Sequence, residues 1–313
     1  MVQPVNCDKT DFIIPQGASL AYVINQLEEE GCVGNSVYLK YMIIITSRDT
    51  KIKPGTYDLS GVSDNYQLIE LITSDNVEMV NVTILEGWSV EEISKKFFEV
   101  FKIDTVKFKS LCRNSKFIKS LGIDASSLEG YLYPETYLFS VDFIHNNTKE
   151  VDIISTLVNE FKRKYKEAVK GRLHTELSMH ELVTLASIIQ GECIYLNEMD
   201  TVSSVYHNRL KKGMLLQADP TIQYIIPGPN RRLFNKDYLR YRDNPYNTYS
   251  HKGLPPGPIN SPGFHAIKAA AYPVNTSFLF FVAKGNNQHY FTENERDHIN
   301  AKNKYLKDLW DKP

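Results

Sequence analysis

Glu192 is the side chain of this sequence best placed for acid–base chemistry, because it is a carboxylate on an otherwise apolar helical stripe. A helix is predicted over residues 178–192, since Ser178 and Glu181 have the spacing of a capping box at its start. The apolar positions of this helix recur at helical spacing, at Leu182, Leu185 and Ile189. Glu192 is the next position on the same stripe.

Burial at this position would change the chemistry of the Glu192 carboxyl group. An ionised carboxylate is costly among apolar side chains, so its pKa is expected to rise until the group keeps its proton near neutral pH. A carboxylic acid that holds a proton in a cleft is suited to general acid catalysis. The helix alone leaves a second interpretation open, in which Glu192 has reached the surface or pairs with an Arg.

The composition is that of an ordinary globular protein. The chain has 313 residues, 42% of them hydrophobic and 23% charged, which is enough for two or three domains. Its formal net charge of -1 gives no general attraction to nucleic acid or to anionic lipid. No segment approaches the roughly 18 apolar residues of a membrane span, and the amino terminus lacks the pattern of a signal peptide.

The cysteines predict neither a metal site nor a disulfide framework. They lie far apart in the sequence and form no C-x-x-C pair, at Cys7, Cys32, Cys112 and Cys193. They leave the redox compartment open.

The first hundred residues contain a weak internal repeat. Both copies place a Gly turn and a Ser N-cap before an amphipathic helix, at Gly17-Ala-Ser19-Leu20 and at Gly87-Trp-Ser89-Val90. A turn that leads into a strand is predicted over 53–57, a strand over 80–84 and a short helix over 67–73. Such units look like the LysM-type modules that bind glycan chains, although they are common in other proteins.

The remaining chain predicts helices around two loop regions. Residues 89–175 are mostly helical in pattern, with an aromatic and acidic loop over 128–137 and a basic run over 162–170 that suits a solvated helix face. A helix over 201–212 follows Glu192. The stretch 219–263 is rich in Pro, Gly, Asn and Tyr, and long ordered loops are usually functional. A helix over 266–271 and an apolar strand over 278–282 are then predicted, and they are followed by Gln288-His289-Tyr290-Phe291-Thr292.

From about Gly17 to its end, the sequence resembles the YceG-like family, the endolytic murein transglycosylases of MltG type. The resemblance rests on ordered motifs: Leu128-Glu-Gly-Tyr-Leu-Tyr-Pro-Glu-Thr-Tyr137, Ala186-Ser-Ile-Ile-Gln-Gly-Glu192, Asn208-Arg-Leu210, Leu216-Gln-Ala-Asp-Pro-Thr221, Tyr246-Asn-Thr-Tyr249, Gly253-Leu-Pro-Pro-Gly-Pro-Ile259 and His289-Tyr-Phe291.

The resemblance implies an α+β fold, with a LysM-like α+β subdomain over residues 1–88 and a mixed α+β catalytic domain over 89–313. It also implies a carbon–oxygen lyase of cell-wall biogenesis, which cleaves MurNAc-GlcNAc bonds within nascent peptidoglycan strands and leaves 1,6-anhydroMurNAc ends. The catalytic Glu of the family falls on Glu192. One carboxyl group can suffice for this reaction as acid and then base, because the nucleophile is the C6 hydroxyl of the substrate.

Further site residues are expected by the same resemblance. Asp219 is expected either to stabilise the transition state or to serve only as an N-cap. Arg209 is expected to pair with a buried carboxylate, with Asp219 as a candidate. The expected substrate-binding residues are polar groups of the loops and of the aromatic segment: Gln217, Asn247, Tyr249, His289, Glu129 and Tyr131.

The sequence departs from the family pattern in three places. The family pattern has Asn-Pro-Gly, whereas this sequence has Asn260-Ser261-Pro262-Gly263. The Asn is therefore displaced by one position, which puts its contact in doubt. Gln190 and Gly191 replace a charged pair, and Gly191 is expected to mark a kink or a close approach of substrate. The amino-terminal membrane helix of the family is absent from this sequence.

No metal or organic cofactor is implied. The resemblance implies a single-pass protein of the cytoplasmic membrane with its catalytic domain outside the cytoplasm, and cell-wall synthases (penicillin-binding proteins) as partners in glycan strand termination. Two alternatives remain open: a hydrolytic muramidase and a non-catalytic glycan-binding scaffold.

Overall fold

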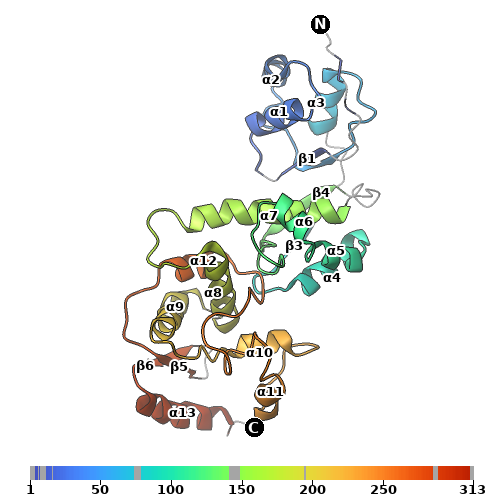
Figure 1. Cartoon of the computed structure of the whole chain (residues 1–313). Coiled ribbons are helices and arrows are strands. Elements are labelled where there is room, and N and C mark those ends of the chain that lie inside the picture. The colour runs from blue at the N-terminus through green and yellow to red at the C-terminus, as the bar shows by residue number, and fades with distance from the viewer. Residues whose placement is uncertain are drawn as a thin grey trace. The chain divides into compact units, whose positions relative to one another are not determined.

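The computed structural model describes residues 4–5, 7, 12–15, 17–73, 79–140, 149–193, 195–284 and 288–310. The chain is mixed α+β, as predicted, with three two-stranded antiparallel sheets in this described part (Figure 1). It divides into two compact units. The first comprises Met1–Ile84, Ser94–Phe108 and Glu135–Thr156, and the second comprises Leu85–Ile93, Lys109–Pro134 and Leu157–Pro313. The LysM-like assignment of residues 1–88 stays a prediction.

One hydrophobic core of the first unit is built from three helices and a short sheet. The helices are α1 (Leu20–Glu29), α2 (Ser36–Ile45) and α3 (Asn65–Thr73), and β1 (Phe12–Ile14) pairs with β2 (Gly55–Tyr57). Ser19 caps α1 as predicted, since its side chain accepts a hydrogen bond of 3.2 Å from the Tyr22 amide. Cys7 and Cys32 form a disulfide bond, which the cysteine spacing did not predict.

A second sheet of this unit joins segments far apart in the sequence. β3 (Met79–Thr83) pairs with β4 (Thr136–Ser140), so the predicted loop over 128–137 ends in a strand. The unit also holds an aromatic cluster in which Phe139 lies edge-on to Phe97 and Phe101, with ring centroids 5.6 Å and 5.5 Å away. Helices α4 (Val90–Phe101), α5 (Thr105–Leu111) and α7 (Lys149–Ala168) contribute residues to both units.

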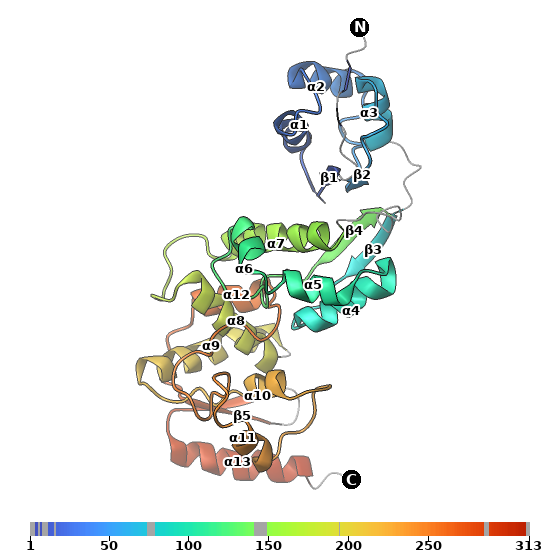
Figure 2. The ribbon, with the colours of Figure 1, turned by 45° about the vertical axis from the view of Figure 1, so that its right-hand side comes forward.

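The second unit is organised around helix α8 (Met179–Glu192). Every residue from Leu182 to Ile189 is buried, because α9 (Leu196–Lys211) and α12 (Phe264–Ala271) pack against α8 and against each other (Figures 1 and 2). Small residues of α12 are fully buried at these contacts, among them Ala266, Ala269 and Ala270. Beyond α9, the hairpin of β5 (Phe280–Ala283) and β6 (His289–Thr292) packs against α13 (Glu295–Trp310).

The described part of this unit also contains three short helices: α6 (Ser115–Ser120), α10 (Asp219–Ile225) and α11 (Asn235–Arg240). The last two lie within the stretch 219–263 that was predicted to be rich in loops. Each has fewer than eight residues, too few for an apolar period to be recognised in the sequence. Among the described residues, no helix is both long and apolar enough to cross a membrane.

Candidate active site

Glu192 is the last residue of α8 and is partly exposed. The helix starts with the predicted capping box, in which the Ser178 side chain accepts from the Glu181 amide and the Glu181 side chain accepts from the Ser178 amide. At the other end, Oε1 of Glu192 accepts a hydrogen bond of 2.9 Å from the hydroxyl of Tyr206 on α9. Tyr206 is fully buried, so one side of the carboxyl group is held by a fixed donor.

The surroundings of Glu192 raise its pKa to about 7. Burial is the largest cause, and the charge of Asp219 acts in the same direction. The hydrogen bond from Tyr206 and the charge of Arg209 oppose it. Near neutral pH the carboxyl group therefore exists in both protonation states, which is what a group that first gives and then takes a proton requires.

Asp219 is the first residue of α10, and its side chain is exposed. Its Oδ1 accepts two phenolic hydrogen bonds, of 2.6 Å from Tyr249 and 3.0 Å from Tyr238. The two phenol rings lie 4.5 Å apart, centroid to centroid. The N-cap of α10 is Ala218, without a side-chain cap, so the expectation that Asp219 serves only as an N-cap is wrong.

Gly191 brings α8 against the start of α10. A Cβ atom added to Gly191 would lie 2.7 Å from Cβ of Pro220, closer than carbon atoms pack. Pro220 fits the first turn of α10 because that turn needs no amide donor from it. The close approach expected at Gly191 therefore involves Pro220 of the protein itself. Glu192 follows Gly191 in the sequence, and Asp219 precedes Pro220. The two carboxylate residues therefore flank this tight contact.

Arg209 is buried but, within the part of the chain that the structure describes, it does not pair with a carboxylate as expected. Its Nε donates to the carbonyl of Leu279 at 2.6 Å, and its Nη1 donates to the carbonyl of Leu216 at 2.7 Å. Its guanidinium also lies over the ring of Phe280, 5.2 Å from the centroid. Arg209 thus fixes the loop ahead of Asp219 to the start of the β5–β6 hairpin.

Gln217 and Asn247 have contrasting positions. Gln217 is exposed and has a φ of 50°, a left-handed conformation that is uncommon for a residue with a side chain. Asn247 is fully buried, and its Nδ2 donates to the carbonyls of Tyr238 and Tyr241. Its Oδ1 accepts from the amide of Tyr249. Both amide hydrogens of Asn247 therefore tie the loop of Tyr249 to α11, which carries Tyr238, and to its C-cap.

His289 connects the β5–β6 hairpin to α9. Its Nδ1 and its backbone amide both lie about 3 Å from the carboxylate of Glu198, at 2.9 Å and 3.0 Å. The ring of Phe281 packs edge-on against both His289 and Tyr206, with centroid distances of 5.1 Å and 5.9 Å. His289 thus supports the wall behind Tyr206, and its expected contact with substrate stays a prediction.

Glu129 and Tyr131 lie in the interior of the second unit. Oε1 of Glu129 accepts a hydrogen bond of 3.0 Å from the Val90 amide, and burial raises the pKa of Glu129 to about 8. Tyr131 is fully buried, and its hydroxyl lies 2.7 Å from Nδ1 of His180, whose Nε2 lies 2.9 Å from the carbonyl of Pro256. Glu129 thus binds the backbone at the start of α4, whereas Tyr131 is linked to the Pro256 backbone only through His180, and the expected contacts of both residues with substrate stay predictions.

The displaced Asn260 is also buried. Its Nδ2 donates to the carbonyl of Ser187 at 2.9 Å, and its neighbour Ser261 exchanges two backbone hydrogen bonds with Gly87 and Trp88. This segment ties α8 to the Gly87 turn.

The two supporting phenols, Tyr206 and Tyr238, were not predicted. A signal for Tyr206 exists in the sequence, because Val202, Tyr206 and Arg209 recur at helical spacing along α9 and are all buried. Tyr238 has no such signal, since its short helix was not predicted.

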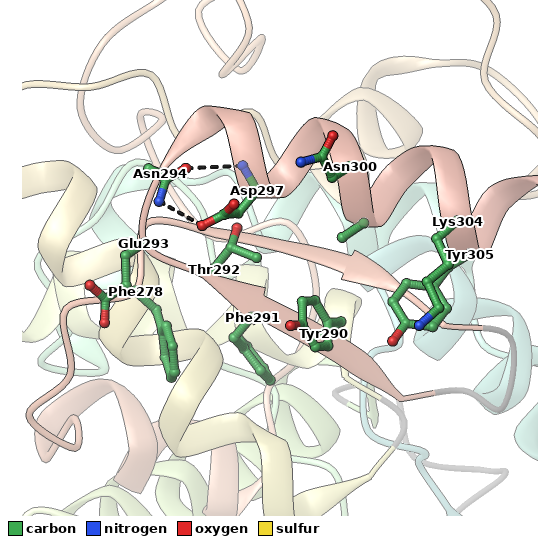
Figure 3. Close-up of a pocket in the computed structure, with 11 residues that line it drawn as sticks. Phe278, Tyr290, Phe291, Thr292, Glu293, Asn294, Asp297, Asn300, Lys304 and Tyr305 are labelled. Atoms are coloured by element: carbon green, nitrogen blue, oxygen red, sulfur yellow. Dashed lines mark hydrogen bonds between the residues drawn. The ribbon is translucent and has the colours of Figure 1, made fainter.

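A separate concavity of about 400 Å³ lies between β6 and α13 (Figure 3). Several of its polar groups already bind one another, since Asn294 and Asp297 exchange hydrogen bonds of 2.8 Å and 2.9 Å at the start of α13. Glu293 accepts from the Ser277 hydroxyl. The lining of this concavity does not include Glu192 or Asp219. These two carboxyl groups and the phenols that bind them are therefore the stronger candidate for catalysis.

Comparisons with known proteins show what the chain as a whole is similar to. The endolytic murein transglycosylase of Bacillus subtilis (strain 168) is 29% identical over 327 residues, covering 98% of this chain and 88% of that protein. That of Streptococcus pneumoniae serotype 2 (strain D39) is 25% identical over 96% of this chain, which spans only 60% of that protein. A crystal structure of a YceG-like protein from Listeria monocytogenes has a TM-score of 0.62 and 28% identity, covering 94% of this chain and 98% of that one. The model of the YceG-like family matches residues 12–304, and the chain belongs to this family.

Proposed function

We propose that this protein is an endolytic murein transglycosylase, a lyase that cleaves MurNAc-GlcNAc bonds within peptidoglycan strands. The observation that carries the proposal is the Glu192 carboxyl group, with a pKa of about 7, held by Tyr206 at the open end of α8. The names of the relatives from Bacillus subtilis and Streptococcus pneumoniae support the same reaction.

In the first step, protonated Glu192 gives its proton to the oxygen of the glycosidic bond. The bond from C1 of MurNAc to this oxygen then breaks, and the GlcNAc part leaves with a new hydroxyl group. Positive charge develops at C1 as the electron pair departs with the oxygen. The hydrogen bond from Tyr206 stabilises the carboxylate that Glu192 becomes.

In the second step, ionised Glu192 takes a proton from the C6 hydroxyl of the same MurNAc. The C6 oxygen attacks C1 and closes a 1,6-anhydro ring, so no water is consumed and Glu192 is again protonated. Because the nucleophile belongs to the substrate, the protein needs to supply only positioning and charge stabilisation.

Asp219 is the group proposed to stabilise the positive charge at C1. Its carboxylate is exposed, and two phenols orient it through Oδ1. A charge held in place by fixed donors stabilises a transition state without the cost of reorganisation. Gln217, which is exposed and lies two residues before Asp219, is proposed to bind an N-acetyl or hydroxyl group, and Tyr249 is proposed as a further contact.

The site of action that fits this reaction is the cell wall, outside the cytoplasm. The Cys7–Cys32 disulfide supports that placement, because disulfide bonds persist in oxidising compartments. Anchoring to the outer face of the cytoplasmic membrane and association with cell-wall synthases belong to the same proposal.

The test is mass spectrometry of the products formed from uncrosslinked glycan strands. The wild-type chain is compared with Glu192→Gln and with a control, Glu176→Gln, which changes an exposed Glu just ahead of α8. We expect 1,6-anhydro ends, one water lighter than hydrolytic ends, from the wild type and the control only. Reducing ends would instead establish a hydrolytic muramidase. Strand binding without cleavage by any of the three proteins would establish a glycan-binding scaffold.

A further inference from the structure

We propose that residues 230–242, which include helix α11, form a docking surface for an anionic lipid bilayer. We call this segment the cationic face. It contains five cationic side chains and one carboxylate, Asp237: the cations are Arg231, Arg232, Lys236, Arg240 and Arg242. The whole chain, in contrast, has 36 Lys and Arg against 37 Asp and Glu. The positive charge is therefore a local feature, and an anionic surface is its complement.

Two large apolar side chains are exposed among these cations. Leu239 is 71% exposed and Phe234 is 49% exposed. Within α11, Lys236, Leu239 and Arg240 lie at helical spacing on one exposed side, whereas Asp237 is buried. Exposed apolar side chains between cations are typical of elements that lie in the interface of a bilayer.

The cationic face is held in one conformation by its single carboxylate. Asp237 accepts from Nη2 and Nη1 of Arg231 at 2.7 Å and 2.9 Å, and it also accepts from the Phe234 amide. These hydrogen bonds join the segment that precedes α11 to Asp237 in the first turn of the helix. The remaining cations are thus presented outward by a turn that is already ordered, which lowers the entropy cost of docking.

Phe234 lies at the centre of this arrangement. The guanidinium of Arg232 and the ammonium of Lys236 are 5.6 Å and 5.7 Å from its ring centroid. The same residues line an open concavity of about 530 Å³, together with Leu233 and Asn235. Two cations beside an exposed ring provide charge for a phosphate headgroup and an apolar surface for the acyl chains below it. A soluble polyanion has no apolar part that would contact the exposed side chains of Phe234 and Leu239.

Docking at this face would position the candidate active site. Tyr238, next to Asp237 in α11, donates to Asp219 through its hydroxyl. The helix that would touch the bilayer therefore also orients a carboxylate of the site. The proposal concerns binding alone, and it stands or falls separately from the catalytic proposal.

The test is co-sedimentation of the full chain with vesicles of phosphatidylcholine alone or with about one third phosphatidylglycerol. We expect binding only to the anionic vesicles. Lys236→Gln/Arg240→Gln should lower the partition coefficient roughly 25-fold, since each cation near an anionic bilayer contributes about fivefold. The matched control is Lys211→Gln/Lys212→Gln, which removes the same charge from two exposed lysines at the end of α9 and should bind like the wild type.

A second variant, Phe234→Ser/Leu239→Ser, tests insertion without changing charge. It should bind weakly and lose its remaining binding at high salt, where the wild type keeps part of its affinity. Thermal unfolding of each variant should match that of the wild type, because the altered side chains are exposed. Equal binding to neutral and anionic vesicles, or equal loss in the Lys211 and Lys212 control, would overturn the proposal. Inhibition of binding by inorganic polyphosphate, with no effect of the Phe234 and Leu239 changes, would assign the face to a soluble polyanion instead.

Discussion

The hydroxyl of Tyr206 and the Oε1 atom of Glu192 form a hydrogen bond of 2.9 Å between two helices, α9 and α8. Tyr206 is fully buried, whereas Glu192 is partly open to solvent. The bond fixes the carboxyl group on its protein side and lowers its pKa against the larger effect of burial. The position and the proton affinity of Glu192 are therefore set together by one neighbouring side chain.

The first prediction concerns the pH dependence of the wild-type reaction. Because burial raises the pKa of Glu192 to about 7, and because a general acid must be protonated to act, kcat/KM should be highest below that pH. It should decrease as the pH rises through about 7. Initial rates of glycan-strand cleavage from pH 5 to 9 would measure this alkaline limb. A rate that is constant across this range would contradict the assignment of Glu192.

The second prediction concerns Tyr206→Phe. Loss of the hydroxyl removes a bond that lowers the pKa of Glu192, so the pKa should rise and the alkaline limb should move to higher pH. The free energy of unfolding should fall by about 1 kcal/mol, which is typical for one lost hydrogen bond. The rate profile and chemical denaturation give the two values. A lower unfolding free energy with an unchanged pH–rate profile would show that Tyr206 contributes to stability but does not set the pKa of Glu192.

The third prediction concerns Asp219→Asn. The negative charge of Asp219 raises the pKa of Glu192, so its removal should move the alkaline limb to lower pH, opposite to Tyr206→Phe. The maximal rate should fall about 100-fold if Asp219 stabilises the charge at C1. Asp200→Asn, which removes an exposed carboxylate from α9, serves as the control. An unchanged maximal rate with a shifted alkaline limb would show that Asp219 acts only through its charge on the pKa of Glu192.

The fourth prediction concerns Gly191→Ala. The added Cβ would lie 2.7 Å from Cβ of Pro220, so α10 must move away from α8. Overpacking of this kind typically costs about 1–3 kcal/mol. Gly61→Ala is the matched control, because an added Cβ meets nothing within 4 Å at Gly61. The denaturant midpoints of both variants measure the change in stability. Equal midpoints would show that α10 moves away from α8 without a loss of unfolding free energy.

The fifth prediction concerns Glu129→Gln and the pH dependence of stability. Burial raises the pKa of Glu129 from 4.5 to about 8, so the folded protein binds a proton that the unfolded chain releases between these values. The stability from this group is present below pH 4.5 and is lost as the pH rises through about 8. At about 1.4 kcal/mol per pKa unit, the loss is on the order of several kcal/mol.

Glu129→Gln should remove this contribution, because Gln keeps an acceptor for the Val90 amide but does not ionise. Its unfolding free energy should therefore change less between pH 5 and pH 8.5 than that of the wild type. Urea unfolding at the two pH values measures the difference, and Glu176→Gln provides an exposed Glu for comparison. Parallel changes in all three proteins would count against a buried acid at position 129.

The sequence predicted those features that depend on neighbours along the chain. Helix α8 was predicted from the capping box at Ser178 to its end at Glu192, because caps and apolar periods are local signals. The same reasoning placed Ser19 and strand β3 correctly. Helix α9 begins at Leu196, five residues before the prediction, since polar residues in its first turn hid its start.

Features that depend on distant partners were not predicted. Nothing in the residues around Arg209 distinguishes a guanidinium that pairs with Asp219 from one that binds the carbonyls of Leu216 and Leu279, because every residue has a carbonyl. The phenol pair on Asp219 likewise depends on where Tyr238 and Tyr249 come together in space. The bond between Cys7 and Cys32 is of the same kind, since spacing alone does not define a pair.

The ends of α8 and α10 that carry Glu192 and Asp219 have opposite polarity. Glu192 is the last residue of one helix and Asp219 is the first residue of the other. Peptide dipoles give a helix partial negative charge at its carboxyl end and partial positive charge at its amino end. The first helix therefore opposes ionisation of the Glu192 carboxyl group, in the same direction as its burial. The backbone thus acts on the two positions with opposite sign, in addition to the side chains around them.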